Sequence, residues 1–231
     1  MRSSVLSLLV VVVVAGCAST NPVLEKRVLE WHAKSSTQMF DGKGLFQKPM
    51  APAVGQYTVY RMTSGEDRSV LRNAIVGKEG NGWIIESQTI NGKNEAITQM
   101  LIAGLEKTWE TLDPDHLDIV WVKIKQDDGE VQKLDGPVLS ITRGTYKKLL
   151  NGLYLRFNKD EGMAAVKVPA GTFNNCTKAI TEFDFLLWSD TVEAFYHPSV
   201  PMNGIVRSVS TDGDNLMELV EFGTNGARPS F

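Results

Sequence analysis

The start of the chain restricts most strongly which residues can contribute to a folded domain. Arg2 supplies a positive charge, Val5–Ala15 is uncharged and apolar apart from Ser7, and Ala15-Gly16 leads directly into Cys17. A basic start, a short apolar run and small residues at its end are typical of a secretory signal peptide. The apolar run is shorter than the roughly 20 residues needed to cross a bilayer. We therefore predict that residues 1–16 are a signal peptide, removed before the mature domain functions.

The four residues Val14-Ala15-Gly16-Cys17 resemble the lipobox of bacterial lipoproteins. The resemblance implies cleavage before Cys17, acylation of the Cys17 thiol and of the new amine, and a membrane attachment through this residue. Residue 18 is Ala and not Asp, which in this class implies the outer membrane, facing the periplasm. One acyl chain attaches a protein only marginally, so the three chains of this class would make the anchor effectively permanent.

Charge and cysteine content exclude some classes of protein. The chain has 24 Lys and Arg against 27 Asp and Glu, and loss of Arg2 with the leader changes the formal net charge from -3 to -4. Nucleic-acid binding, which requires a basic face, is therefore not expected. Only two cysteines are present. Lipid on Cys17 would leave Cys176 without a disulfide partner, and we interpret Cys176 as a small buried apolar residue.

Strand-forming runs separated by turn residues occupy most of the chain after residue 55. Asn91-Gly92 and Asp212-Gly213 are typical of tight hairpins. Glu95–Ala103 also contains helix formers, but the preceding hairpin favours a strand. The sequence thus predicts an α+β fold built on an antiparallel meander. The predicted strands cover Tyr57–Met62, Ser69–Val76, Trp83–Ile90, Glu95–Ala103, Asp118–Gln126, Ala164–Val168, Thr172–Phe185, Gly204–Ser210 and Asn215–Phe222.

Two helices are predicted around this meander. Asn21-Pro22 provides a cap and a first helical residue, and Leu24, Val28 and Trp31 fall on one face of the helix that follows. The main helix is predicted at Pro137–Asn151, before Gly152. Residues 37–54 are interpreted as a linker or as a segment lying over the core. We therefore divide the chain into a signal peptide (1–16), a lipidated N-terminus with short helix and tether (17–54) and one domain (55–231).

The last third of the chain resembles bacterial envelope proteins of the LolA/LolB-like half-barrel class. The resemblance is carried by Val166–Phe173 (VKVPAGTF), by Cys176 and Trp188, and by Val200–Arg207 (VPMNGIVR). It implies a strongly curved antiparallel sheet, a half-barrel, wrapped on one main helix, with an apolar ligand or lipid held on the concave face. The residues placed there by the resemblance are Val168, Phe173, Phe183 and Phe185. A filled core at these positions is the alternative.

Catalytic and metal-binding patterns are sparse. The three histidines are His32, His116 and His197, and no Gly-x-Ser-x-Gly elbow or phosphate-binding loop occurs. The acidic stretch Asp113–Asp118 around His116 suits a solvated loop better than a metal site. We therefore expect neither enzymatic activity nor a cofactor or catalytic metal.

The sequence predicts a non-enzymatic, lipid-anchored envelope protein, in one of two roles. The first role is binding of a lipid or other apolar ligand by the half-barrel. The alternative is a structural or assembly component that binds an envelope protein partner.

Overall fold

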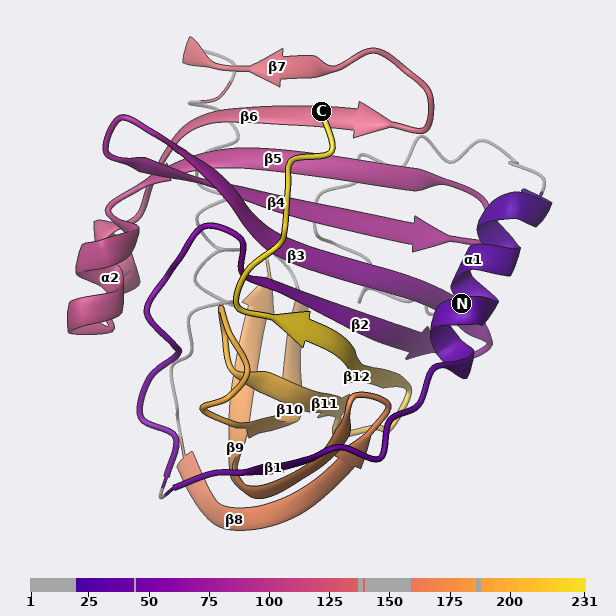
Figure 1. Cartoon of the computed structure of the whole chain (residues 1–231), viewed down its shortest axis with the longest axis vertical. Coiled ribbons are helices and arrows are strands. Elements are labelled where there is room, and N and C mark those ends of the chain that lie inside the picture. The colour runs from indigo at the N-terminus through magenta and orange to yellow at the C-terminus, as the bar shows by residue number, and fades with distance from the viewer. Residues whose placement is uncertain (1–19, 44, 137–138, 140–158, 186–187) are drawn as a thin grey trace.

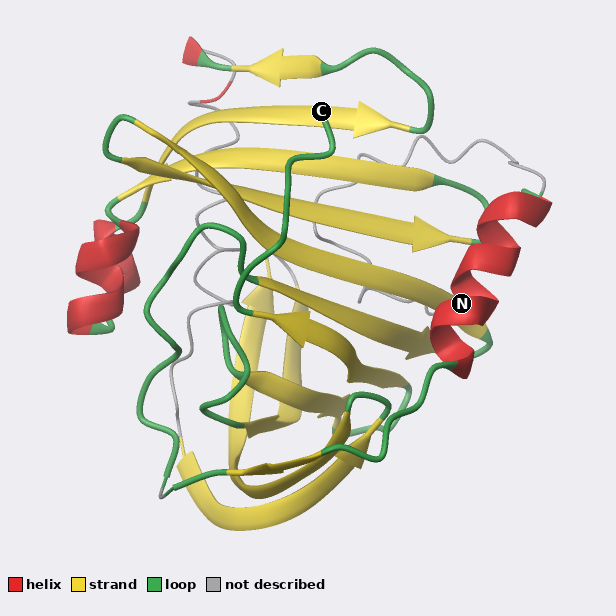
Figure 2. Cartoon of the chain, in the orientation of Figure 1, coloured by secondary structure: helices red, strands yellow, loops and turns green. Residues whose placement is uncertain are grey.

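The computed structural model describes residues 20–43, 45–136, 139, 159–185 and 188–231. The predicted signal peptide, Cys17 and the predicted helix Pro137–Asn151, apart from Leu139, lie outside the described residues. Within them, the apolar alternation produces one twelve-stranded sheet (Figures 1 and 2). The strands are β1 (Met39–Asp41), β2 (Tyr57–Ser64), β3 (Asp67–Glu79), β4 (Gly82–Asn91), β5 (Glu95–Ala103), β6 (Asp118–Gln126), β7 (Gln132–Leu134), β8 (Lys159–Val168), β9 (Gly171–Phe185), β10 (Trp188–Tyr196), β11 (Ile205–Ser210) and β12 (Asn215–Gly223).

The predicted meander is confirmed in two runs of strands. Each strand from β2 to β7 pairs antiparallel with the next, as does each strand from β8 to β12. An antiparallel pairing of β12 with β2 joins the two runs. The sheet is nevertheless mixed, because β1 pairs parallel with β9 through Met39–Thr172. In Figure 1, β9 and β10 run across the direction of β2–β6.

The described part of the chain is mostly β, with two α-helices, where the sequence predicted an α+β fold around one main helix. Helix α1 (Pro22–Ala33) lies across one end of strands β2–β5, and α2 (Leu105–Thr111) lies at the other end (Figures 1 and 2). Helix α1 begins as predicted, with Asn21 as its cap. Helix α2 was missed, because it is short and starts at Gly104, whose positive φ of 78° reverses the chain direction.

Strand β10 (Trp188–Tyr196) was also missed, since no strand was predicted between Phe185 and Gly204. Val192, Ala194 and Tyr196 are buried at every second position of the strand. This period of two is the signal of a half-buried strand. Phe195, which is buried between Ala194 and Tyr196, obscured this alternation.

The hairpin at Asn91-Gly92 is confirmed, but it is not the two-residue turn that the sequence suggested. Strand β4 ends at Asn91 and β5 starts at Glu95. The Asn91 Oδ1 accepts hydrogen bonds from the backbone N–H groups of Lys93 and Asn94, each at 2.8 Å. The side chain of Asn91, and not a pair of positive φ angles, therefore fixes this connection.

In the described part of residues 37–54, Phe40 and Phe46 pack on the main core cluster, so this part does not form a free tether. The buried Phe46 donates its backbone N–H to Thr177 Oγ1 at 2.6 Å, and its ring lies 5.5 Å from that of Tyr196. The ring of Phe40 stacks on Phe173 at 4.5 Å. Of the two interpretations offered by the sequence, the segment over the core is the one that the structure shows.

Buried residues form three clusters on the two faces of the sheet. The main cluster surrounds Tyr60, Phe173 and Tyr196, and a second one surrounds Ile102 and Ile119. The third lies under α1, where Leu24 and Val28 pack against Val59, Val70 and Ile90. Because successive strand residues alternate between faces, Val59 and Tyr60 serve opposite sides of β2. Helix α1 therefore covers the face opposite the main core.

Candidate functional site

A recess in the described residues lies between α1 and two hairpin ends, and we call it the α1 groove. It has a volume of about 510 Å³. Its lining comes from the start of α1, from the β2–β3 hairpin and from the β4–β5 hairpin. These residues are Thr20, Glu25, Val28, Leu29, Met62, Thr63, Ser64, Glu66, Asp67, Arg68, Ser69, Thr89, Asn91, Gly92, Lys93, Asn94 and Ala96.

The start of α1 is fixed directly to the β4–β5 hairpin. The Asn21 backbone N–H donates to Gly92 O at 2.8 Å, and Asn21 Oδ1 accepts from the N–H groups of Val23 (3.1 Å) and Leu24 (3.4 Å). These bonds satisfy donors that a helix start otherwise leaves free. The chain therefore has a defined position at the groove from Asn21 onward.

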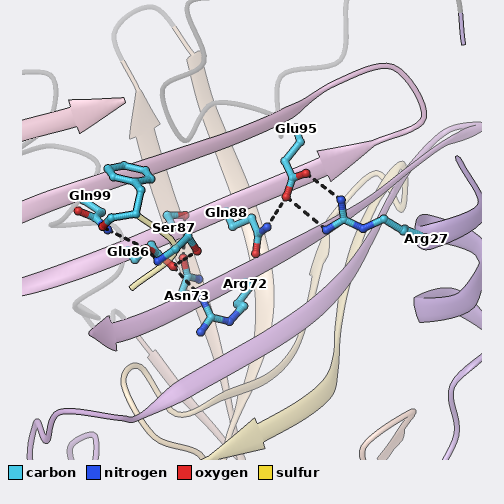
Figure 3. A network of polar contacts seen from close by, with 10 residues as sticks. Arg27, Arg72, Asn73, Glu86, Ser87, Gln88, Glu95 and Gln99 are labelled. Carbon is cyan, nitrogen blue, oxygen red and sulfur yellow. Dashed lines mark hydrogen bonds and ion pairs between the residues drawn. The ribbon is translucent and has the colours of Figure 1, made fainter. Parts of the chain in front are cut away.

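An ion pair holds the middle of α1 on the sheet. Arg27 donates from Nη1 to Glu95 Oε2 at 2.8 Å and from Nη2 to Oε1 at 3.3 Å, and Gln88 also donates to this carboxylate (Figure 3). Burial alone would raise the pKa of Glu95. The hydrogen bonds of Arg27 and Gln88, with the charges of Arg27 and Lys125, outweigh burial and lower that pKa below its usual value. The carboxylate thus stays ionised and keeps α1 in place.

The groove combines apolar walls with charges of both signs. The apolar side chains that α1 contributes are the buried Val28 and the exposed Leu29, and the five charged lining residues are also exposed. Within the described part of the chain, none of these five side chains lies in an ion pair. They are Glu25, Glu66, Asp67, Arg68 and Lys93. Such a lining suits a ligand that carries apolar atoms and both a cationic and an anionic group.

A second polar network lies farther along the same face (Figure 3). Glu86 is fully buried on β4, and it accepts from Arg72 Nη1 and Gln99 Nε2, each at 2.9 Å. Ser230 donates to the same carboxylate from its backbone N–H and from Oγ, each at 2.8 Å. The segment that ends at Phe231 crosses the sheet above these strands (Figure 1). A fully hydrogen-bonded buried carboxylate therefore ties this segment to the sheet.

The structure places two of the four predicted ligand residues in packed protein. Val168 and Phe173 belong to the main core cluster, with Phe173 fully buried, and neither lines the α1 groove. Phe183 and Phe185 lie on β9, but their side chains are outside the described residues, as is Cys17. The structure therefore does not bring the predicted residues together into one described site.

The remaining reactive side chains are dispersed. Cys176 is buried as expected, and burial raises the pKa of its thiol to about 12. His197 is fully buried with its ring 5.2 Å from that of Phe173, and burial is the main cause that lowers its pKa. His116 lies 3.8 Å from Asp113 in a short turn. Among the described residues, no group of three His, Cys, Asp or Glu side chains is arranged to hold a metal ion.

The α1 groove was not predicted from the sequence. Its residues are polar turn residues at hairpin ends, which local patterns assign only to solvent. The one available signal was the short distance along the chain between Cys17 and the helix cap Asn21.

Comparisons with known proteins give no family for this chain. No protein-family model matches it, and no curated protein matches it. A solved structure of a candidate lipoprotein from Parabacteroides distasonis aligns with 77% of this chain and 100% of its own, at 14% identity and a TM-score of 0.34. This is a distant structural similarity and carries no functional argument. No helix in the described ranges is long and apolar enough to cross a membrane.

Proposed function

We propose that this protein is a non-enzymatic, lipid-anchored binding protein of the bacterial envelope, attached through Cys17 to the periplasmic face of the outer membrane. One observation carries the proposal. Asn21 is hydrogen-bonded to Gly92, and only four peptide units separate Asn21 from Cys17, the residue proposed to be acylated. At 3.3–3.6 Å per residue, these units span about 14 Å at most. The α1 groove is thus held beside the membrane surface.

Exposed apolar side chains on α1 also support a position of this helix beside the membrane surface. Val23 is 68% exposed and Leu29 is 45% exposed, both on α1. Exposed apolar side chains gain free energy when they enter the boundary between lipid head groups and acyl chains. The first turns of α1 therefore add membrane contact to the lipid anchor.

The LolA/LolB-like half-barrel, with a lipid on a concave face, stays a finer prediction. It depends on the segment that contains Pro137–Asn151 and on the side chains of Phe183 and Phe185. Since Val168 and Phe173 already fill the main core, we place the binding function of the described residues in the α1 groove. Capture of one envelope protein by crosslinking from this face, with no ligand bound in the groove, would favour the assembly role instead.

The test is lipid attachment at Cys17, measured in intact cells fed an alkyne analogue of palmitate. We expect the wild-type protein to carry the label, to start at Cys17 in intact-mass spectra and to fractionate with the outer membrane. Cys17→Ser should abolish labelling and leave the leader uncut. Cys176→Ser is the matched control, because it removes the only other thiol and should leave labelling unchanged. An unlabelled wild-type protein, or a labelled Cys17→Ser variant, would overturn the proposal.

A further inference from the structure

We propose that the α1 groove binds the head group of a zwitterionic aminophospholipid, a lipid with a phosphate diester and a primary ammonium group. The inference rests on the proposed attachment through Cys17 and specifies the ligand class of the groove.

The position of the groove is the first argument. Thr20 lines the groove and is three residues from Cys17, a separation of about 11 Å at full extension. Each polar layer of a bilayer is about 5–8 Å thick, as the difference between the total and hydrocarbon thickness shows. A recess tied so closely to an acylated residue therefore lies within reach of lipid head groups.

The charges of the groove are the second argument. Arg68 on β3 and Lys93 in the β4–β5 turn can donate to a phosphate, while the carboxylates of Glu25, Glu66 and Asp67 can accept from an ammonium group. None of these side chains has to leave an ion pair of the described structure to do so. With three carboxylates and two cations the lining has a formal charge of -1, and an anionic head group without an ammonium would make it -2, which disfavours such a ligand.

The apolar wall is the third argument. Val28 and Leu29 of α1 line the same recess as the charged rim, and Leu29 is 45% exposed. The volume of about 510 Å³ lies within the usual range for small-ligand sites, roughly 300–1,000 Å³. It accommodates a glycerol phosphate ester and leaves apolar surface for the first methylene groups of the acyl chains.

The experiment is calorimetric titration of the mature acylated protein in a non-ionic detergent with glycerophosphoethanolamine, which carries the head group without acyl chains. Glycerophosphoglycerol, inorganic phosphate and ethanolamine are titrated in parallel. We expect the zwitterion to bind about tenfold more tightly than any of these three, because only the zwitterion supplies both charged contacts.

Two charge-neutralising variants and two matched controls locate the site. Lys93→Gln and Glu66→Gln should each weaken binding of glycerophosphoethanolamine about fivefold or more. Lys107→Gln and Glu110→Gln remove the same charges from exposed positions of α2, at the other end of the sheet, and should leave binding unchanged (Figure 1). Equal effects of all four variants would overturn the location, and equal binding of glycerophosphoglycerol or of phosphate would overturn the ligand class.

The two proposals can fail separately. If Cys17 is acylated but glycerophosphoethanolamine does not bind, the head-group site is wrong and the lipid anchor stands. If Cys17 is not acylated, the anchor is wrong, and the groove loses the position that argues for a lipid.

Discussion

The buried carboxylate of Glu86 provides the sharpest test of how the sheet holds the segment that ends at Phe231. Glu86 accepts four hydrogen bonds, two of them from Ser230, and its side chain is fully buried beside the Arg72 guanidinium. Glu86→Gln keeps the shape but removes the charge and replaces one acceptor oxygen with a donor. The new NH2 group would replace either Oε1, which accepts from Arg72, or Oε2, which accepts from the Ser230 backbone N–H. In both orientations one of these donors would lose its acceptor and face another donor.

The expected loss is about 3 kcal/mol. Breaking a buried ion pair at one partner costs roughly 3–5 kcal/mol. The lower end applies because the side chain of Arg72 is 23% exposed and can regain some hydration. For a domain of this size, each kcal/mol lowers Tm by about 2–4 °C, so the variant should melt about 6–12 °C below the wild type.

The free energy of unfolding is measured by urea denaturation, and protection of the Ser230 amide by hydrogen exchange. Glu79→Gln, at an exposed position at the end of β3, is the matched control and should stay within about 0.5 kcal/mol of the wild type. The Ser230 amide should lose protection in Glu86→Gln only. A stability loss under about 1 kcal/mol, with Ser230 still protected, would refute the assigned role of Glu86.

Two further predictions concern the strands around β9. Burial lowers the pKa of His197 below 6.5 in the folded protein, so the unfolded chain binds more protons than the folded one as the pH falls. The stabilisation from neutral His197 is therefore complete above about pH 6.5 and is lost as pH falls through the folded pKa. Denaturation at pH 7.5 and pH 5 should show a smaller loss for His197→Asn than for the wild type, and an equal loss would contradict this. Gly171→Ala should destabilise more than Gly213→Ala in the same assay, because both have positive φ but only at Gly171 would a Cβ lie 2.4 Å from Gln38 O. Equal effects would show that the backbone angle alone matters there.

Local patterns in the sequence were sufficient for the elements whose causes are local. The alternation in β2 to β6 and the turn residues at Asn91-Gly92 and Asp212-Gly213 predicted the meander, since side-chain period and turn preference act over a few residues. The cap Asn21 and the apolar face through Leu24 and Val28 predicted α1 for the same reason. The leader and the lipobox resemblance also depend only on adjacent residues, and they remain predictions.

Tertiary structure decided the features that join distant residues. The parallel pairing of β1 with β9 links Met39 to Thr172, and it places Phe40 over Phe173 of the core. Glu86 is buried only because Arg72, Gln99 and Ser230 meet it from other segments. The α1 groove likewise exists only where three separate segments converge. Whether a polar residue faces solvent or a site depends on neighbours far away in sequence, and this information is absent from any local window.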